Sequence, residues 1–232
     1  MTRGVLIVGN ESLLCAAIAA QAAKRVERFA QALLPNRLAD QGRGGLKASY
    51  LSQGSVSPDP GSTVIPLTWN PGSPISARTL VLSAERQLER VDEAVLVCAP
   101  PSLRRPVAEI LPLDIEILVN DHIKGWFFLV RELAGIFRAR RAGTLALVVP
   151  EFGSGRDDQA DLLGVPAVAA FRALAQGILA SSAAEPYLAL GFSSQETGEN
   201  ENFAAYIFKL IDEAGKRNSG KWYKYGRFNF LK

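Results

Sequence analysis

Residue types that could transfer a proton are present in this chain, but not at the spacing that the chemistry needs. A tyrosine hydroxyl exchanges a proton readily when a lysine one helical turn later lowers its pKa, because the i, i+4 spacing places both side chains on one helix face. No Tyr-x-x-x-Lys sequence occurs, and Tyr223 is followed directly by Lys224. The adjacent carboxylates Asp157 and Asp158 lie among Gly and Ser residues, which indicates a solvated pair. Gly-x-Ser-x-Gly and Walker sequences are also missing, so the sequence contains no complete catalytic set.

The thiols and the imidazole do not form a metal-binding pattern either. His122 is the single histidine, and no Cys/His spacing accompanies it. Cys15 and Cys98 both lie in apolar surroundings, which favours two buried free thiols over a disulfide. We therefore expect no metal site.

Charge and hydropathy exclude several classes of partner. A net charge of +3 over 232 residues is too small to indicate binding to nucleic acid or to an anionic membrane. The first apolar run is interrupted by Asn10, Glu11 and Ser12, which argues against a signal peptide. No uninterrupted run of 18 apolar residues occurs, so we expect no membrane span and a cytoplasmic protein.

The elements that must position any site alternate along the chain. Short apolar runs without polar alternation predict strands at 4–8, 64–68, 94–98, 145–149, 187–191 and 221–225. Periodic apolar positions predict helices at 12–24, 76–90, 116–141, 166–184 and 202–214. Residues 26–34 fit either a second strand or a continuation of the first helix. Residues 35–62 are rich in Gly, Ser, Pro and Asp and predict an irregular loop excursion.

Alternation of strands and helices predicts an α/β fold. We expect a Rossmann-like, doubly wound, mostly parallel sheet of about seven strands with helices on both faces. The length suits one domain over residues 1–232, and no internal repeat or interdomain linker is evident.

Residues 119–150 resemble the middle of a short-chain dehydrogenase/reductase. In that family an Asn lies in a long helix, a Gly follows, and a later strand ends at a catalytic serine. Here Asn120 and Gly125 are followed by the strand from Gly143 to Pro150. The resemblance covers residues 4–226 and is weakest between 34 and 62. Its other matching pieces are Leu6-Ile7-Val8-Gly9, residues 91–97, Gly177 and Ser219-Gly220-Lys221.

The resemblance implies an NAD(P) cofactor over the first strand-to-helix turn, although the residues there depart from the family. The family usually has Thr-Gly-x-x-x-Gly-x-Gly, whereas here Gly9 is followed by Leu13 and Cys15 at the other glycine positions. We expect Leu13 to narrow the groove over Gly9 and Glu11 to oppose phosphate. The chain's own residues thus support no cofactor, and NAD(P) is implied by the family alone. The cofactor-contacting positions carried over are Gly9, Asn10, Leu14, Asn70, Cys98 and Ala99.

Two further loops of the implied cofactor site also differ. The third strand should end in an Asp that contacts adenine, but Trp69 and Asn70 stand there, and we expect Trp69 to be a packing anchor. The fourth strand ends in Cys98-Ala99-Pro100, where Pro100 replaces a glycine and lacks an N–H group.

The family's catalytic positions are altered as well. Alignment on Gly177 places Val168 at the tyrosine and Arg172 at the lysine, and Pro150 stands at the strand end near the serine position. Valine carries no exchangeable proton, and arginine does not act as a base. Asn120 alone matches, and without the tyrosine we expect it to satisfy a backbone group in a helix irregularity.

These departures leave two readings of the function open. The first is a degenerate, non-catalytic protein of this fold that acts through oligomerisation, partner binding or small-molecule sensing. The alternative is an NAD(P)-dependent oxidoreductase with an atypical active site.

Family members usually assemble through two long helices, which here correspond to 116–141 and 166–184. Trp126, Phe127 and Phe128 are consecutive and must point in three directions around a helix, at about 100° each. At least one of them must find an apolar surface other than the sheet. We therefore expect a homodimer or homotetramer that uses these helices.

Overall fold

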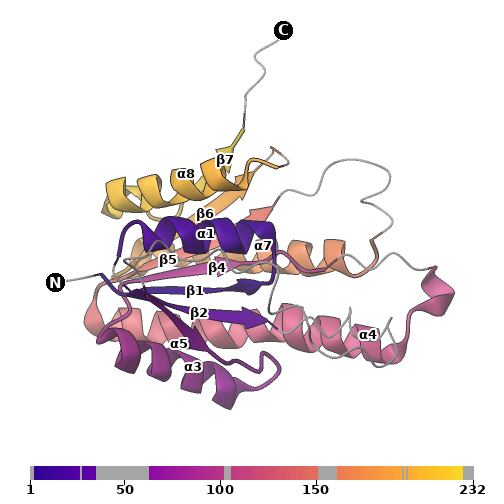
Figure 1. Ribbon diagram of the computed structural model, residues 1–232. Coiled ribbons are helices and arrows are strands. Elements are labelled where there is room, and N and C mark those ends of the chain that lie inside the picture. The colour runs from indigo at the N-terminus through magenta and orange to yellow at the C-terminus, as the bar shows by residue number, and fades with distance from the viewer. Residues whose placement is uncertain are drawn as a thin grey trace, which may run out of the picture.

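Seven strands form one parallel sheet (Figure 1). The computed structural model describes residues 3–26, 28–34, 63–101, 106–150, 161–194, 196 and 198–226. The order across the sheet is β3-β2-β1-β4-β5-β6-β7, and all neighbouring pairs are parallel. The strands are β1 (Val5–Asn10), β2 (Arg28–Leu34), β3 (Thr63–Leu67), β4 (Glu93–Val97), β5 (Thr144–Pro150), β6 (Leu188–Ser194) and β7 (Trp222–Tyr225). The chain therefore has the Rossmann-like, doubly wound fold that the sequence predicts.

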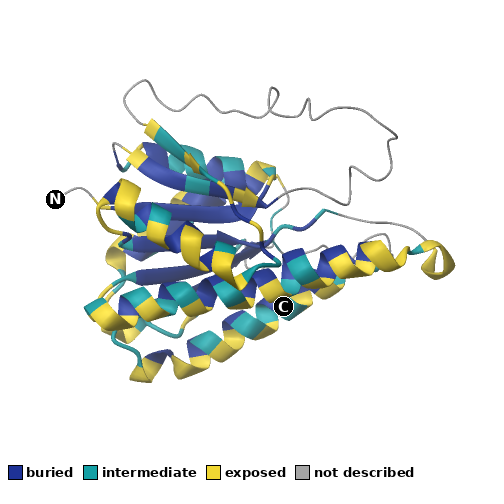
Figure 2. Ribbon diagram, turned by 90° about the horizontal axis from the view of Figure 1, so that it is seen from below, coloured by how far each residue is buried: buried dark blue, intermediate teal, exposed yellow. Residues whose placement is uncertain are grey.

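The central strands are buried on both faces, which explains their unbroken apolar runs. Every residue of β1 and β4 is buried, as Figure 2 shows for the middle of the sheet. Leu6 and Val8 point into the core on one side of the sheet, whereas Val5 and Ile7 point into the core on the other.

Helices cover each face of the sheet. On one face lie α3 (Pro74–Leu88), α5 (Gly125–Arg140) and α7 (Gly164–Ser181), whose aromatic residues Trp126, Phe137 and Phe171 are buried. On the other face lie α1 (Leu13–Ala23) and α8 (Asn200–Glu213), which contribute Ile18 and Phe203. Short 3₁₀ turns are η2 (Val107–Glu109), η4 (Ser182–Ala184) and η5 (Lys216–Asn218).

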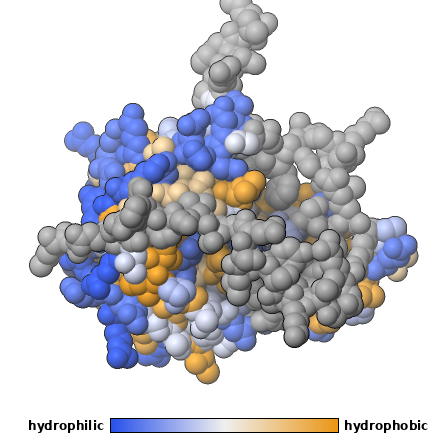
Figure 3. All heavy atoms as spheres, viewed as in Figure 1, coloured by the Kyte–Doolittle hydropathy of each residue, from blue (hydrophilic) through white to orange (hydrophobic). Residues whose placement is uncertain are grey.

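The long helix predicted at 116–141 is interrupted by a wider turn. It consists of α4 (Pro112–Ile117), the π-helical segment η3 (Leu118–Lys124) and α5. Its first part projects beyond the sheet (Figures 1 and 2). Leu113 and Ile115 of α4 are exposed, and so is Leu111, the N-cap residue before it. Figure 3 shows hydrophilic residues over α8 and hydrophobic residues beside α4. The projecting arm therefore has apolar surface that the chain itself does not cover.

Most of the predicted elements are confirmed, with small shifts at their ends. The ambiguous stretch 26–34 contains strand β2 and is not a continuation of α1. The predicted loop excursion at 35–62 lies outside the described residues, as do Asp157 and Asp158. Both cysteines are free and buried, as expected.

Residues 164–184, which comprise α7 and η4, are long and apolar enough to cross a membrane by length and composition. About a third of this segment is buried inside the structure. The sequence expectation of no span considered only uninterrupted apolar runs. In the structure, Phe171, Ala175 and Leu179 of this helix are buried in the core on one face of the sheet. Part of the apolar character of this helix is therefore explained by its packing against the sheet.

Candidate functional site

The carboxyl ends of β1 and β4 meet at the point where strand order reverses, which is where doubly wound sheets bind ligands. Gly9 pairs with Val97 across these two strands. A Cβ atom at position 9 would lie 2.9 Å from the Val97 Cβ and 3.0 Å from the Cys15 Sγ, so only glycine fits. Gly9, which matches the first glycine of a dinucleotide-binding turn, thus allows close packing between β1, β4 and α1.

Asn10 fills the crevice between the two strand ends. The side chain is 4% exposed, and its Oδ1 accepts a hydrogen bond of 3.0 Å from the Ala99 N–H. Its Nδ2 lies 3.4 Å from Nδ1 of His122, which is 1% exposed. One side chain therefore connects β1, the loop after β4 and the π-helical segment.

The hydrogen bond from Ala99 also determines the tautomer of the imidazole. Because Oδ1 of Asn10 is the acceptor for a backbone N–H, its Nδ2 must face His122 and donate. Nδ1 of His122 must then be unprotonated, and the ring proton lies on Nε2. Burial lowers the pKa of His122 to about 4, so the ring is neutral near pH 7 and can accept.

The start of α1 differs from a phosphate-binding turn. Ser12 is the N-cap, and its Oγ accepts a hydrogen bond of 3.1 Å from the Cys15 N–H. Leu13 is 80% exposed, so the prediction that it narrows the groove over Gly9 is wrong: its side chain points into solvent. Leu14 is buried in the core beneath α1 and offers only its backbone to this end of the sheet. Burial raises the pKa of the Cys15 thiol to about 12, which makes it unreactive.

The loop after β3 packs against the long helix. Trp69 is 6% exposed, and its ring centroid lies 5.6 Å from that of Trp126, so the expected packing role is confirmed. Asn70 is exposed, and its backbone N–H donates to Ser76 Oγ at the start of α3. Cys98 is wholly buried, and burial raises the pKa of its thiol. Of the predicted cofactor positions, the structure thus brings together Gly9, Asn10 and Ala99.

Asn120 lies in a helix irregularity, as expected, but its side chain is hydrogen-bonded to no backbone group among the residues that the structure describes. Its Oδ1 accepts a hydrogen bond of 2.9 Å from Lys124 Nζ. The backbone carbonyl of Asn120 accepts from the Gly125 N–H across the wider turn. The predicted role for the side chain was therefore wrong.

The other positions that match catalytic residues of the family, Val168, Arg172 and Pro150, do not lie together around Asn120. Val168 is buried in the core that also holds Trp126 and Phe171. The guanidinium of Arg172 lies over the ring of Trp222 in β7, at the far edge of the sheet. Pro150 ends β5 beside Ser194 of β6. These positions offer no tyrosine-like hydroxyl and no lysine-like cation at the β1–β4 crevice.

His122 is the residue of this site that sequence reasoning missed as a partner of Asn10. The two lie 112 positions apart, and the wider turn of η3 changes which helical residues face the sheet. The only sequence signal was the single histidine, which lies two residues after Asn120.

Comparison with known proteins identifies the fold. No protein-family model matches the sequence, and no curated protein matches it in sequence. Among solved structures, a short-chain dehydrogenase from Rhodopseudomonas palustris superposes with a TM-score of 0.70 at 13% identity, covering 97% of this chain and 99% of that one. Levodione reductase gives 0.69 at 14% identity, covering 96% and 95%. A putative 3-oxoacyl-reductase from Bacillus thuringiensis gives 0.68 at 12% identity, covering 97% and 96%. The chain therefore has the fold of short-chain dehydrogenases/reductases.

Proposed function

We propose that this chain is a divergent short-chain dehydrogenase/reductase that has lost cofactor-dependent catalysis. It acts through assembly with its own copies and through recognition of a partner or a small molecule. The observation that carries this proposal is the filled β1–β4 crevice, where Asn10 binds Ala99 and His122. A dinucleotide would have to displace a buried side chain and leave a backbone N–H and an imidazole without partners, which costs about 1–3 kcal/mol for each buried group.

The turn before α1 adds to this barrier. A pyrophosphate binds a helix N-terminus through free backbone N–H groups and close backbone approach. Here Ser12 already accepts the Cys15 N–H, and the exposed carboxylate of Glu11 lies in the same turn. Both features oppose a phosphate at this position.

Catalysis would also lack its proton donor. Val168 is buried and carries no exchangeable proton. Pro150 stands near the position at which the family has its catalytic serine, and it has no hydroxyl. The side chain of Asn120 is hydrogen-bonded to Lys124 and has no tyrosine at position 168 to serve.

The alternative function is an NAD(P)-dependent oxidoreductase with an atypical active site. The fold shared with reductases favours it, and so does the Asn120–Lys124 pair, which keeps an amide and an ammonium side by side. An assay of NADH and NADPH oxidation with a panel of aldehydes and ketones separates the two functions. We expect no oxidation above the protein-free rate. Turnover that is lost in Asn120→Ala would instead establish the alternative.

We also propose that the protein forms a homodimer or homotetramer through α5 and α7. The two helices border an open apolar groove of about 610 Å³, and Phe127 within it is 51% exposed. Trp126 is fully buried, so the three consecutive aromatics do point in different directions. Small residues of α7, among them Ala170, Ala173 and Gly177, line the other side of the groove. A groove with a bulky ring on one wall and small residues on the other suits a self-complementary contact across a two-fold axis.

A further inference from the structure

A second concave site lies at the β7 edge of the sheet, and β3 forms the other edge. It is a cavity of about 440 Å³ between α7 and β7, lined by Arg172, Gln176, Trp222, Tyr223 and Lys224. Three strands, β4, β5 and β6, separate β7 from β1. The cavity is therefore distinct from the crevice that Asn10 fills, and nothing in the proposed function uses it.

The wall of this cavity is an indole held in place by β6. A Cβ atom at position 191 would lie 2.5 Å from a ring carbon of Trp222, so the indole lies against the strand only because residue 191 is glycine. The Nε1–H of Trp222 donates a hydrogen bond of 3.0 Å to Ser193 Oγ, and Ser193 is completely buried. A ring fixed in this way is a preorganised surface, because little conformational entropy is lost when a ligand contacts it.

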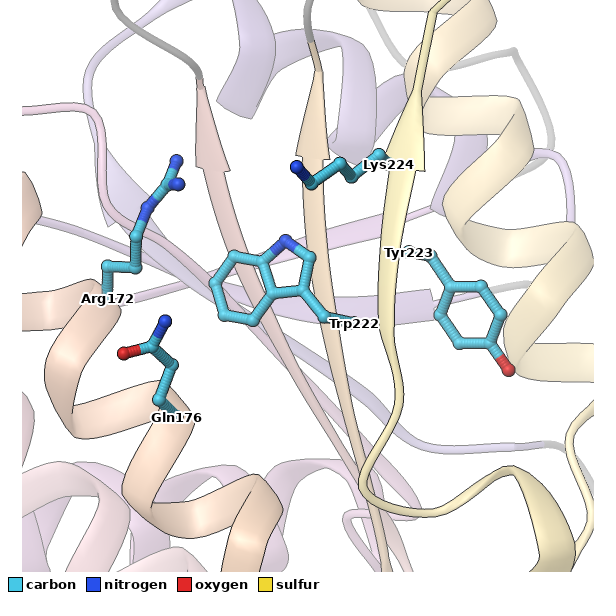
Figure 4. A pocket seen from close by; sticks show the side chains of 5 residues that line it. All are labelled: Arg172, Gln176, Trp222, Tyr223 and Lys224. Carbon is cyan, nitrogen blue, oxygen red and sulfur yellow. The ribbon is translucent and has the colours of Figure 1, made fainter. Parts of the chain in front are cut away.

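Cationic groups flank this indole. The guanidinium carbon of Arg172 lies 5.5 Å from the Trp222 ring centroid, within the range of a cation–π contact. Lys224 is two residues after Trp222, so both side chains leave β7 on the same face. Figure 4 shows the cationic ends of Arg172 and Lys224 beyond the indole, toward the carboxyl ends of the strands, with the amide of Gln176 on its other side. Tyr223 points to the opposite face, where it stacks on Phe192.

Two of the described residues that line the cavity, Arg172 and Lys224, are cations. The others are Gln176, the indole of Trp222, and Tyr223, whose ring points to the opposite face. An arginine presents a flat pair of N–H donors that matches a carboxylate, while a lysine adds a point charge. The volume is that of a site for a small molecule.

We infer that this cavity binds a small organic carboxylate with a flat, conjugated body. The carboxylate lies between Arg172 and Lys224, the flat part lies along the indole of Trp222, and a polar group at the other end reaches Gln176. The two cations are the reason for inferring a carboxylate, and the fixed indole is the reason for inferring a flat, conjugated body. This inference goes beyond the proposed function and holds whether or not the β1–β4 crevice accepts a nucleotide.

Para-hydroxybenzoate is a suitable probe, because it carries a carboxylate and a hydroxyl at opposite ends of a ring. Binding can be followed by indole fluorescence: Trp69 and Trp126 are buried in the core, whereas Trp222 is only partly buried. We expect a saturable change in fluorescence that disappears in Trp222→Phe. Isothermal titration of the same variant should show weaker binding, and an affinity equal to that of the native chain would overturn the contact with the indole.

Matched variants test the role of charge. We expect Lys224→Met to weaken binding about tenfold, the loss typical of one charge-assisted hydrogen bond. Lys24→Met removes the same charge from the exposed end of α1, on the other face of the sheet, and should leave the affinity unchanged. Arg172→Met should weaken binding at least as much, and its cooperative thermal unfolding would show that the fold is kept.

Matched ligands test the rest of the inference. Para-hydroxybenzyl alcohol keeps the ring and loses the charge, and inorganic phosphate keeps a charge and loses the ring. Both should bind at least tenfold more weakly than para-hydroxybenzoate. Equal binding of the alcohol, displacement of the probe by phosphate at equal concentration, equal losses in Lys24→Met and Lys224→Met, or no saturation would each overturn the inference.

Discussion

At the scale of single residues, Asn10 is the residue that connects the most elements at the carboxyl ends of β1 and β4. Its side-chain amide is hydrogen-bonded to Ala99 and His122 and so connects β1, the loop after β4 and the π-helical segment. The neutral imidazole is required, because a protonated His122 could not accept from Asn10. Stability should therefore depend on the protonation of this one ring.

We predict that the stability of the protein falls in acid through His122. The folded pKa is about 4 and the ordinary value is 6.5, so the unfolded chain takes up the proton first as the pH drops. The contribution is fully present above pH 6.5 and is lost as the pH falls from 6.5 to about 4. A difference of that size corresponds to about 3 kcal/mol in the free energy of unfolding.

Urea unfolding of the native chain and of His122→Asn, each measured at several values of pH, checks this prediction. Asparagine keeps an acceptor near the position of Nδ1 but does not titrate, so the acid loss due to His122 should be missing from the variant while that of the carboxylates remains. Because the chain has one histidine, its NMR signal is unambiguous. An imidazole that titrates near pH 6.5 in the folded protein would contradict the prediction.

At the scale of elements, α7 has two apolar faces with different partners. Phe171, Ala175 and Leu179 face the sheet, while Ala173, Leu174 and Gly177 line the groove beside Phe127. Ala169 and Ala173 both lie in the helix predicted at 166–184. Only Ala173 lines the groove, and Ala169 is exposed outside it. The outward face is thus the part of α7 that should mediate assembly.

We predict that Ala173→Glu shifts the assembly toward monomer, because it places a charge in an apolar contact. Light scattering at micromolar concentration measures the change. Ala205→Glu is the matched control, since Ala205 is an exposed alanine of α8 on the opposite face of the sheet. It should leave the subunit number unchanged. A monomer for the unmodified protein would rule out the interface.

At the scale of the whole molecule, local patterns were enough to predict the fold but not the site. Continuous apolar runs such as that of β4 are typical of buried parallel strands, and they identified the sheet. Residues 26–34 stayed ambiguous because a short apolar run fits a strand and a helix equally well.

The candidate site was harder to predict, because its contacts depend on long-range geometry. Gly9 lies near the end of β1 and Ala99 follows β4, close to the strand ends at which the sequence puts them. The pairing of Asn10 with His122 depends on the π-helical turn, and the cavity beside Trp222 depends on how α7 lies over β7. Neither arrangement has a period or a motif in the sequence.

The central claim is that this fold no longer holds a nicotinamide cofactor, and one titration tests it most directly. NADH and NADPH are titrated separately into the native protein by isothermal calorimetry, with cooperative thermal unfolding as the control for an intact fold. The filled crevice predicts no saturable heat for either nucleotide up to millimolar concentration. A dissociation constant below millimolar for either one would show that Asn10 yields to the cofactor, and it would contradict the account.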